Sequence, residues 1–200
     1  MNRPVAVATA AACLMLAACV PWTVRPIDEA EAGGPFDAAR YVDSIWNAKV
    51  LLAVNSGARD LGEALAHYRA GPARAPQALL VKGEGKVLRV DDTSRSGLLL
   101  VDLPPYDGRA DVAVQIGPLV RGTALRDALP FVQFSQFVNQ LDFARAASAL
   151  NDRAVKTALA GFAPAGAAGA NVSFTGAAAF SAEGLPEIVP VSLSLTRGAR

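Results

Sequence analysis

The hydrophobic positions first recur at helical spacing between residues 37 and 54. At about 100° per residue, six residues share one face of the expected helix: Ala38, Tyr41, Val42, Ile45, Ala48 and Leu52. Asp37 precedes this stripe as a candidate N-cap, so we expect the face to pack on a core. Lys49 lies near the centre of the stripe. Its stem can cross apolar surface while the ammonium group reaches water, or the group can face a partner or ligand.

A second helix is predicted to begin at Asp60, because Glu63 three residues later completes the pattern of a capping box. The pair Gly71-Pro72 is expected to end it, since glycine often ends helices and proline cannot continue one. His67 lies on this helix, and we interpret it as a solvent-exposed histidine, not a catalytic one.

From residue 79 onward the hydrophobic period changes to two, which is typical of strands. Five segments show this alternation: Leu79–Val90, Gly97–Leu103, Asp111–Gly117, Asn171–Phe180 and Glu187–Thr196. Gly83 and Gly85 lie inside the first segment, with neither a third glycine nor a following helix. Their spacing therefore favours a bulge or strong coiling of the strand over a phosphate-binding loop.

A long helix is predicted between the third and fourth strands, from about Ser135 to Leu159. Its hydrophobic arc holds eight residues: Phe137, Leu141, Phe143, Ala144, Ala147, Leu150, Val155 and Leu159. Gln140 and Asn151 fall inside the arc. Because buried polar groups are almost always paired, both should hydrogen-bond to neighbouring groups.

The resulting element order, three strands, a helix and two strands, is that of the OB-fold. We therefore predict an α+β protein whose residues 79–196 form a five-stranded, OB-like Greek-key β-barrel. The long helix is expected to cap an open end of the barrel, and the two helices of the N-terminal segment 36–72 to pack outside it. Closure of the barrel would leave short strands without exposed edges.

Residues 1–18 form a separate predicted segment. One positive charge, an apolar run and small residues before a cysteine are typical of a secretory signal peptide. The sequence Leu16-Ala17-Ala18-Cys19 resembles the lipobox of bacterial lipoproteins, in which the cysteine is acylated and becomes the mature N-terminus. The alternative is ordinary cleavage with Cys19 incidental. Residues 19–35 are rich in Pro, Gly, Glu and Ala, which predicts a flexible tether.

Composition and charge exclude several function classes. With 52% hydrophobic and 18% charged residues, the chain is expected to form about one globular domain. Its 19 basic and 18 acidic residues become 18 and 18 once Arg3 leaves with the signal peptide. A neutral mature chain lacks the clustered positive charge that nucleic-acid binding requires, so no nucleic-acid partner is expected.

Cysteine and histidine are too scarce for several kinds of site. Cys13 leaves with the signal peptide and Cys19 carries lipid, so disulfides and thiolate metal sites are excluded. His67 is the one histidine of the chain, which argues against histidine metal sites and a Ser-His-Asp triad. We expect neither a metal nor a cofactor.

Residues 121–127 contain a dense group of charged and polar side chains. Four of them bring two guanidinium groups, a hydroxyl and a carboxylate to the junction between barrel and long helix: Arg121, Thr123, Arg126 and Asp127. Guanidinium groups suit carboxylates, phosphates and sugar hydroxyls, so the cluster is a candidate contact site. The alternative, which we favour, is that these side chains satisfy the backbone of an irregular crossover.

Four aspartates lie in predicted turns: Asp91, Asp92, Asp107 and Asp111. Carboxylates in turns usually accept hydrogen bonds from their own backbone. We therefore expect turn chemistry at these positions and not metal binding.

Two groups of motifs extend over much of the chain. The N-terminal group is Phe36-Asp37-Ala38-Ala39, Tyr41-Val42, Ile45-Trp46 and Lys49-Val50-Leu51. The central group is Gln115-Ile116-Gly117-Pro118, Arg121 to Asp127, Leu129-Pro130-Phe131 and Phe137-Val138-Asn139-Gln140. Together they resemble the predicted periplasmic lipoproteins grouped as domain of unknown function 2291. The resemblance implies an OB-like barrel and, through the usual gene neighbourhood of the family, association with ATP-binding-cassette (ABC) sugar uptake transporters.

These observations predict a non-catalytic, lipid-anchored accessory or binding protein in the bacterial periplasm. Its partners would be the lipid bilayer, through acylated Cys19, and ABC transporter subunits or a solute-binding protein. A saccharide would lie on the barrel face or in the groove between the N-terminal helices and the barrel. One alternative is a saccharide-processing enzyme with a carboxylate pair, for which Asp102 and Asp111 come nearest to a suitable arrangement. The other is a purely structural envelope lipoprotein.

Overall fold

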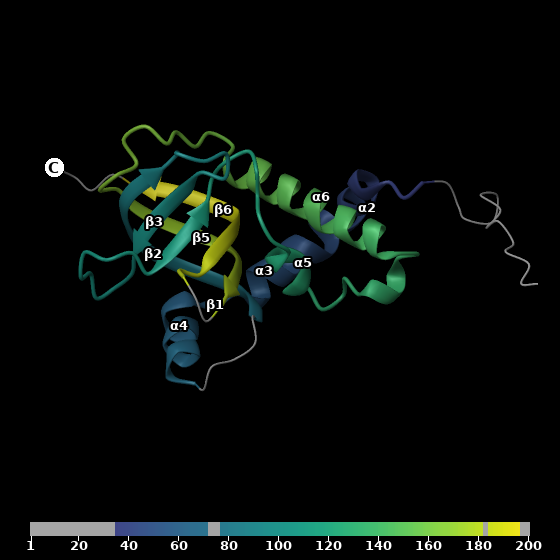
Figure 1. The fold of residues 1–200 in the computed structure, drawn as a ribbon, viewed down its shortest axis with the longest axis horizontal. Coiled ribbons are helices and arrows are strands. Elements are labelled where there is room, and N and C mark those ends of the chain that lie inside the picture. Colours follow the sequence, from purple (N-terminus) through teal and green to yellow (C-terminus); the bar gives the residue numbers. More distant parts are fainter. Residues whose placement is uncertain (1–34, 72–76, 182–183, 197–200) are drawn as a thin grey trace, which may run out of the picture. The chain divides into compact units, whose positions relative to one another are not determined.

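The computed structural model describes residues 35–71, 77–181 and 184–196. The chain divides into two units, Met1–Phe36 and Asp37–Arg200, and the helices and strands of the described residues belong to the second (Figure 1). The predicted signal peptide, Cys19 and nearly all of the predicted tether lie outside the described residues. Among the described residues no helix combines the length and the apolar character needed to cross a bilayer.

The first predicted helix forms in three pieces, α2 (Ala38–Ile45), a π-helical turn (Trp46–Val50) and α3 (Leu51–Gly57). Asp37 is its N-cap, as predicted, because its carboxylate accepts a hydrogen bond from the backbone N–H of Arg40 at 3.0 Å. The π-helical turn adds one residue to a helical turn and thereby rotates the buried face. The buried residues are Val42, Ile45, Trp46, Val50 and Val54.

This rotation corrects the predicted stripe. Ala48, Lys49 and Leu52 were placed on the buried face, and all three are exposed. Lys49 therefore does not cross an apolar core surface, because a uniform step of about 100° per residue fails once the π-helical turn intervenes.

The short strand β1 (Arg59–Asp60) and helix α4 (Leu61–Ala70) follow. Asp60 caps α4 by accepting a hydrogen bond from the backbone N–H of Glu63 at 3.0 Å, and Gly71 is the C-cap, as predicted. His67 is exposed, also as predicted. Strand β1 was not predicted, because two residues are too few to show a period.

One sheet contains six strands: β1, β2 (Gln77–Asp91), β3 (Leu98–Asp102), β4 (Val112–Gln115), β5 (Asn171–Phe180) and β6 (Glu187–Thr196). The strand order is β1-β2-β3-β4-β6-β5, and β5 pairs back to β2, so the five longer strands form a cycle. The pairs β1–β2 and β4–β6 are parallel and the others antiparallel. The α+β class is confirmed, with one more strand than the sequence predicted.

Strand β2 is long because it pairs with two neighbouring strands, first with β5 and then with β3. Its first part pairs with β5 from Gln77 to Lys86, and its last part pairs with β3 from Lys86 to Asp91. The irregularity of its β3 pairing lies between Val87 and Arg89, so the bulge predicted at the glycines is displaced. Gly85 instead permits a close approach of strands, since a Cβ atom there would lie 2.5 Å from Cγ1 of Val101.

Helix α6 (Gln140–Ala158) lies between β4 and β5 in the chain, and it begins five residues later than predicted. Residues Phe134–Gln136 form a 3-10 turn, and the Asn139 side chain caps α6 by accepting a hydrogen bond from the backbone N–H of Asp142. The buried face consists mainly of small residues and contacts β6 and α2: Asp142, Ala146, Ala147, Leu150, Asn151, Ala154, Val155 and Ala158.

Part of the predicted arc of α6 is therefore wrong. Leu141, Ala144 and Gln140 are exposed, and Asp142 is buried. Asn151 is buried as predicted, and its Nδ2 donates a hydrogen bond to the backbone oxygen of Gly122 at 2.9 Å. The sequence prediction assigned the buried arc mainly from the large hydrophobic residues. The helix instead packs through alanines, which allow it to approach the sheet closely.

The main core cluster consists of buried side chains from the strands and from α4. Eleven strand residues belong to it: Val81, Val87, Leu99, Val101, Val112, Val114, Val172, Phe174, Ala178, Phe180 and Ile188. Leu61 and Leu65 of α4 join them, whereas this cluster of described residues includes no residue of α6. Helix α4, which the sequence placed outside the strands, thus contributes to the core cluster, and α6 contacts β6 and α2.

Candidate functional site

Arg121, the first residue of the predicted 121–127 cluster, is tied to β4 by the amide of Gln115. The amide Oε1 accepts a hydrogen bond from the Arg121 backbone N–H at 2.7 Å, and the amide Nε2 donates to the Arg121 backbone oxygen at 3.1 Å. Gln115 is 1% exposed. The Arg121 guanidinium pairs with Oε1 of Glu187 at 2.8 Å, and the arginine side chain is 52% exposed. Backbone and side chain of Arg121 both have partners.

The other three residues of the cluster bond to one another around the short helix α5 (Ala124–Asp127). The Thr123 hydroxyl donates to Oδ2 of Asp127 at 2.6 Å, and the Arg126 guanidinium donates twice to Oδ1 at 2.7 and 2.8 Å. The same guanidinium lies 3.8 Å above the ring of Phe143 on α6, and the Arg126 side chain is 13% exposed. The arrangement fastens the crossover to α6.

The structure joins Thr123, Arg126 and Asp127 to one another and pairs Arg121 with Glu187 instead, so the polar groups of all four residues are used internally. This geometry favours the structural alternative. Lys49, the fifth candidate, is exposed on the π-helical turn and has no hydrogen-bond or ion-pair partner in the part of the chain that the structure describes.

Two of the turn aspartates accept hydrogen bonds from their own turns. Asp107 accepts from the backbone N–H of Arg109 at 2.9 Å. Asp91 accepts from the hydroxyl of Thr93 at 2.6 Å and from its backbone N–H at 3.2 Å, and these two bonds lower the pKa of the Asp91 carboxyl below its usual value. The turn chemistry predicted for these residues is present.

Asp102 and Asp111 hold the loop between β3 and β4. Oδ2 of Asp102 accepts a hydrogen bond from the backbone N–H of Gly108 at 2.8 Å, and Oδ2 of Asp111 accepts from that of Leu103 at 3.0 Å. Asp111 also pairs with Arg69 at 3.2 Å. Both carboxylates thus carry structural bonds, and the described residues contain no group of three or more His, Cys, Asp or Glu that could hold a metal ion.

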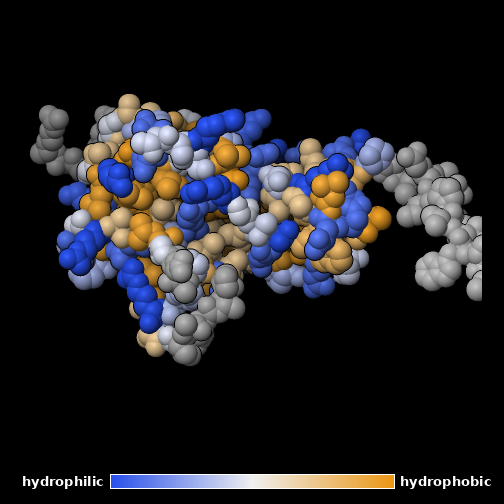
Figure 2. Space-filling view, viewed as in Figure 1, coloured by the Kyte–Doolittle hydropathy of each residue, from blue (hydrophilic) through white to orange (hydrophobic). Residues whose placement is uncertain are grey.

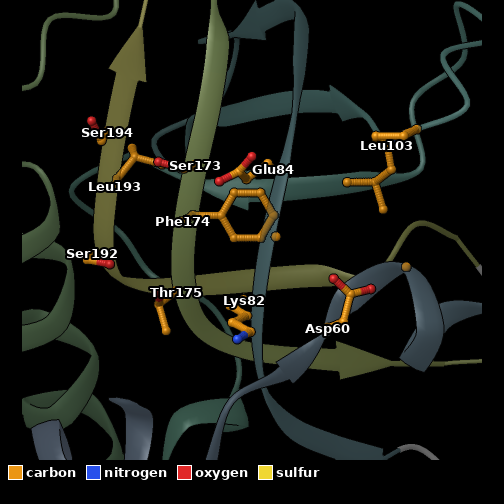
Figure 3. Close-up of a pocket in the computed structure, with 13 residues that line it drawn as sticks. Asp60, Lys82, Glu84, Leu103, Ser173, Phe174, Thr175, Ser192, Leu193 and Ser194 are labelled. Atoms are coloured by element: carbon orange, nitrogen blue, oxygen red, sulfur yellow. The ribbon is translucent and has the colours of Figure 1, made fainter. Parts of the chain in front are cut away.

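A different surface shows more promise as a binding site. A hollow of about 650 Å³ lies between the start of α4 and strands β2, β5 and β6, and we call it the hydroxyl groove (Figure 3). Its lining comes from five separate stretches of the chain: Asp60 and Gly62, Lys82 to Glu84, Leu103 and Pro104, Ser173 to Thr175, and Ser192 to Ser194.

Strand register explains why polar side chains gather in the hydroxyl groove. Two rows of paired residues cross the strands: Asp60, Lys82, Thr175 and Ser192 in the first, and Glu84, Ser173 and Ser194 in the second. Successive side chains of a strand point to opposite faces, so residues two apart share a face and neighbouring rows align. Between the rows lie Gly83, Phe174 and Leu193; Phe174 is buried in the core cluster.

The polar groups of the groove are available to a ligand. Six side chains have no hydrogen-bond or ion-pair partner within the described ranges: Lys82, Glu84, Ser173, Thr175, Ser192 and Ser194. Ser173 and Glu84 are neighbours in the register, and Figure 3 shows both near Phe174. Lysine donates hydrogen bonds, an ionised glutamate accepts them, and hydroxyls do both. A ligand with several hydroxyl groups can therefore bond to every one of these side chains.

The sequence suggested two places for a ligand, the barrel face and the groove between the N-terminal helices and the barrel, but it did not single out these residues. The available signal was the alternation of Ser173 and Thr175 with buried Phe174, repeated by Ser192 and Ser194 around Leu193. This alternation indicates a site only when the strand register is known, because the register places the hydroxyl residues of β5 beside those of β6.

The family model for predicted periplasmic lipoproteins, DUF2291, matches residues 9–194. The chain belongs to this family. The match spans both motif groups, so the predicted resemblance is confirmed, and the protein is a periplasmic lipoprotein anchored to a bacterial cell membrane. No curated protein matches the chain.

One solved structure similar to this DUF2291 member is an OB-fold protein from Thermotoga maritima MSB8. The TM-score is 0.62 at 18% sequence identity, and the alignment covers 81% of this chain and 99% of that one. At this identity the likeness concerns the fold alone. It confirms the OB-fold assignment that the element order predicted.

Proposed function

We propose that this protein is a non-catalytic accessory or binding protein that holds a polyhydroxylated solute for an ABC-type sugar uptake system. The observation that carries the proposal is the hydroxyl groove, where Lys82, Glu84 and four hydroxyl side chains offer donors and acceptors that have no partner within the described residues. A pentose or hexose presents hydroxyls that both donate and accept, so it complements such a surface. The groove volume of about 650 Å³ lies within the range of small-molecule sites.

The proposal includes the architecture and the anchor. We take the cyclic sheet as a five-stranded Greek-key barrel of OB type with α6 between its third and fourth strands. OB-folds bind oligosaccharides in other proteins, which supports the proposal by analogy of fold. We also propose that Cys19 carries the acyl chains, so that the domain stays near transporters of the same membrane. Intact-mass analysis of membrane-extracted protein should show the lipid increment, and Cys19→Ser should release the protein from the membrane or mislocalise it.

The groove is tested with the purified mature protein and a panel of pentoses and hexoses. A sugar at about 100 times its Kd should add about 2.7 kcal/mol to the free energy of unfolding and raise Tm accordingly. The double variant Ser192→Ala/Ser194→Ala should abolish this increase, because it removes two hydroxyls of the groove.

Thr196→Ala is the matched control. Thr196 lies on the same strand at the same two-residue period, two positions beyond Ser194, and it does not line the groove. It should keep the full sugar-induced increase in Tm. Solute binding in the groove is refuted if no sugar of the panel raises Tm, or if the double variant responds as the wild type does.

The enzyme alternative has less support. Asp102 and Asp111, the carboxylates nearest to a catalytic pair, each accept a backbone hydrogen bond within the β3–β4 loop. Turnover of a glycan or lipid substrate that Asp102→Asn abolishes, with the fold intact, would establish the enzyme and overturn the proposal.

A further inference from the structure

A chain of aromatic rings links α2 to the N-terminal end of α6. Tyr41 of α2 contacts Phe137 edge-on with ring centroids 5.3 Å apart, Phe137 contacts Phe143 at 5.2 Å, and Phe143 contacts Phe134 at 5.6 Å. Burial raises the pKa of the Tyr41 phenol, as expected where rings pack together. Aromatic pairs of this kind stabilise the position of the segment that carries them. The N-terminal end of α6 is thus held in place.

Large hydrophobic side chains are nevertheless exposed at this end of α6. Val138 is 86% exposed, Leu141 59% and Phe134 50%, and we call these three residues the α6-tip patch. Figure 2 shows hydrophobic residues at the surface beside α2 and the N-terminal end of α6. Single exposed hydrophobic residues are common, but three within eight positions on a fixed segment mark an interaction surface.

The route of the chain indicates what covers the patch. The described domain begins at Asp37, four residues before Tyr41, whose ring contacts Phe137 next to Val138. Between Cys19 and Asp37 the chain can extend over at most about 60 Å. The domain is therefore joined to its membrane anchor through α2, the helix whose Tyr41 contacts Phe137, the residue before Val138 in the chain.

The charges near the patch point to the kind of contact. Arg145 pairs with Asp142 at 3.3 Å, Arg126 with Asp127 at 2.7 Å, and Arg40 with Asp37 at 3.7 Å. Because each of these three guanidinium groups has a carboxylate partner, they do not form an unpaired basic cluster that would select anionic lipids. Hydrophobic insertion is the interaction that the surface can offer.

We propose that the α6-tip patch inserts into the phospholipid bilayer surface that holds Cys19. The patch and the acyl chains then form two attachments, and the second fixes which face of the domain meets the membrane. This inference rests on the acylated Cys19 of the proposed function. Because the anchor keeps Asp37, the start of the domain, within about 60 Å of the bilayer, even a weak intrinsic affinity of the patch suffices for docking.

The test uses the acylated mature chain, in which Cys19 is the one remaining cysteine and its sulfur carries lipid, so an introduced cysteine is labelled selectively. Val138→Cys is labelled with an environment-sensitive dye and reconstituted in vesicles of zwitterionic phospholipid, and Lys86→Cys, exposed on β2, is the matched control. Docked residues insert about 5 to 10 Å, so the dye at position 138 should shift to shorter wavelength and become about tenfold less accessible to iodide than that at position 86. Phe134→Ser and Leu141→Ser together should restore its accessibility, and added salt should not.

Several outcomes would overturn the proposal. Equal iodide accessibility at the two positions would exclude docking. A wavelength shift that appears without vesicles in the Cys19→Ser chain and grows with protein concentration would show that a second copy covers the patch. If mass analysis finds no acyl chains, the proposed anchor fails by itself. The patch is then judged by adding concentrated vesicles to the labelled Cys19→Ser chain, where an unchanged dye refutes docking.

Discussion

The 121–127 cluster and the hydroxyl groove are both rich in polar side chains, but they differ in how those side chains are used. In the cluster, Thr123, Arg126 and Asp127 bond to one another, and Arg121 bonds to Glu187. In the groove, six polar side chains have no partner among the described residues. A dense polar motif can therefore be part of the scaffold, whereas groups available to a ligand come from strands distant in sequence.

The largest effect on stability is expected from Gln115→Ala. The buried amide bonds to both backbone groups of Arg121 and to Glu187, so its loss leaves buried partners unpaired. The free energy of unfolding should fall by about 2 to 3 kcal/mol in urea denaturation. A change of a few tenths of a kcal/mol would show that the cluster is not built into the fold.

Asp127→Ala should have the next largest effect. It removes the acceptor of the Thr123 hydroxyl and leaves the nearly buried Arg126 guanidinium with the Phe143 ring alone. We expect a loss of about 1 to 2 kcal/mol. Asp127→Asn is the control in thermal unfolding, since it keeps an acceptor oxygen and should lose less.

Arg121→Ala separates the structural role from the contact role. Its ion pair with Glu187 is half exposed, so the stability cost should be about 0.5 to 1 kcal/mol at most. If Arg121 also contacts a transporter subunit, capture of that partner from solubilised membranes should weaken while Tm changes by a few degrees. Unchanged capture with Arg121→Ala would leave Arg121 a purely structural residue.

Lys82→Met should have the smallest effect on stability and a clear effect on binding. Lys82 is exposed and has no partner within the described part of the chain, so unfolding should change by about 0.5 kcal/mol or less. A hydrogen bond from a charged donor contributes about 1.5 to 3 kcal/mol, so solute affinity measured by calorimetry should fall at least about tenfold. If Lys82→Met lowered the free energy of unfolding and left the solute affinity unchanged, Lys82 would have a structural role and not a binding role, which is the opposite of what the comparison predicts.

Local chemistry was readable from the sequence, and so was the OB-fold assignment. Asp37 and Asp60 cap their helices as predicted, because an N-cap depends on a side chain and the backbone three residues away. Strands β5 and β6 have the predicted bounds, since a period of two is a property of the segment itself. The family resemblance and the periplasmic address were likewise carried by contiguous motifs.

Tertiary packing decided the rest. The π-helical turn that exposes Lys49 and the alanine face of α6 follow from docking against other elements, which no single helix projection contains. Leu61 and Leu65 enter the core cluster because β1 pairs with β2 and places α4 there. The hydroxyl groove depends on a register that brings Lys82, Thr175 and Ser192 into one row, although more than 100 residues separate the first from the last. Side-chain alternation is local to a strand, but the alignment of one strand with another is decided when the sheet closes.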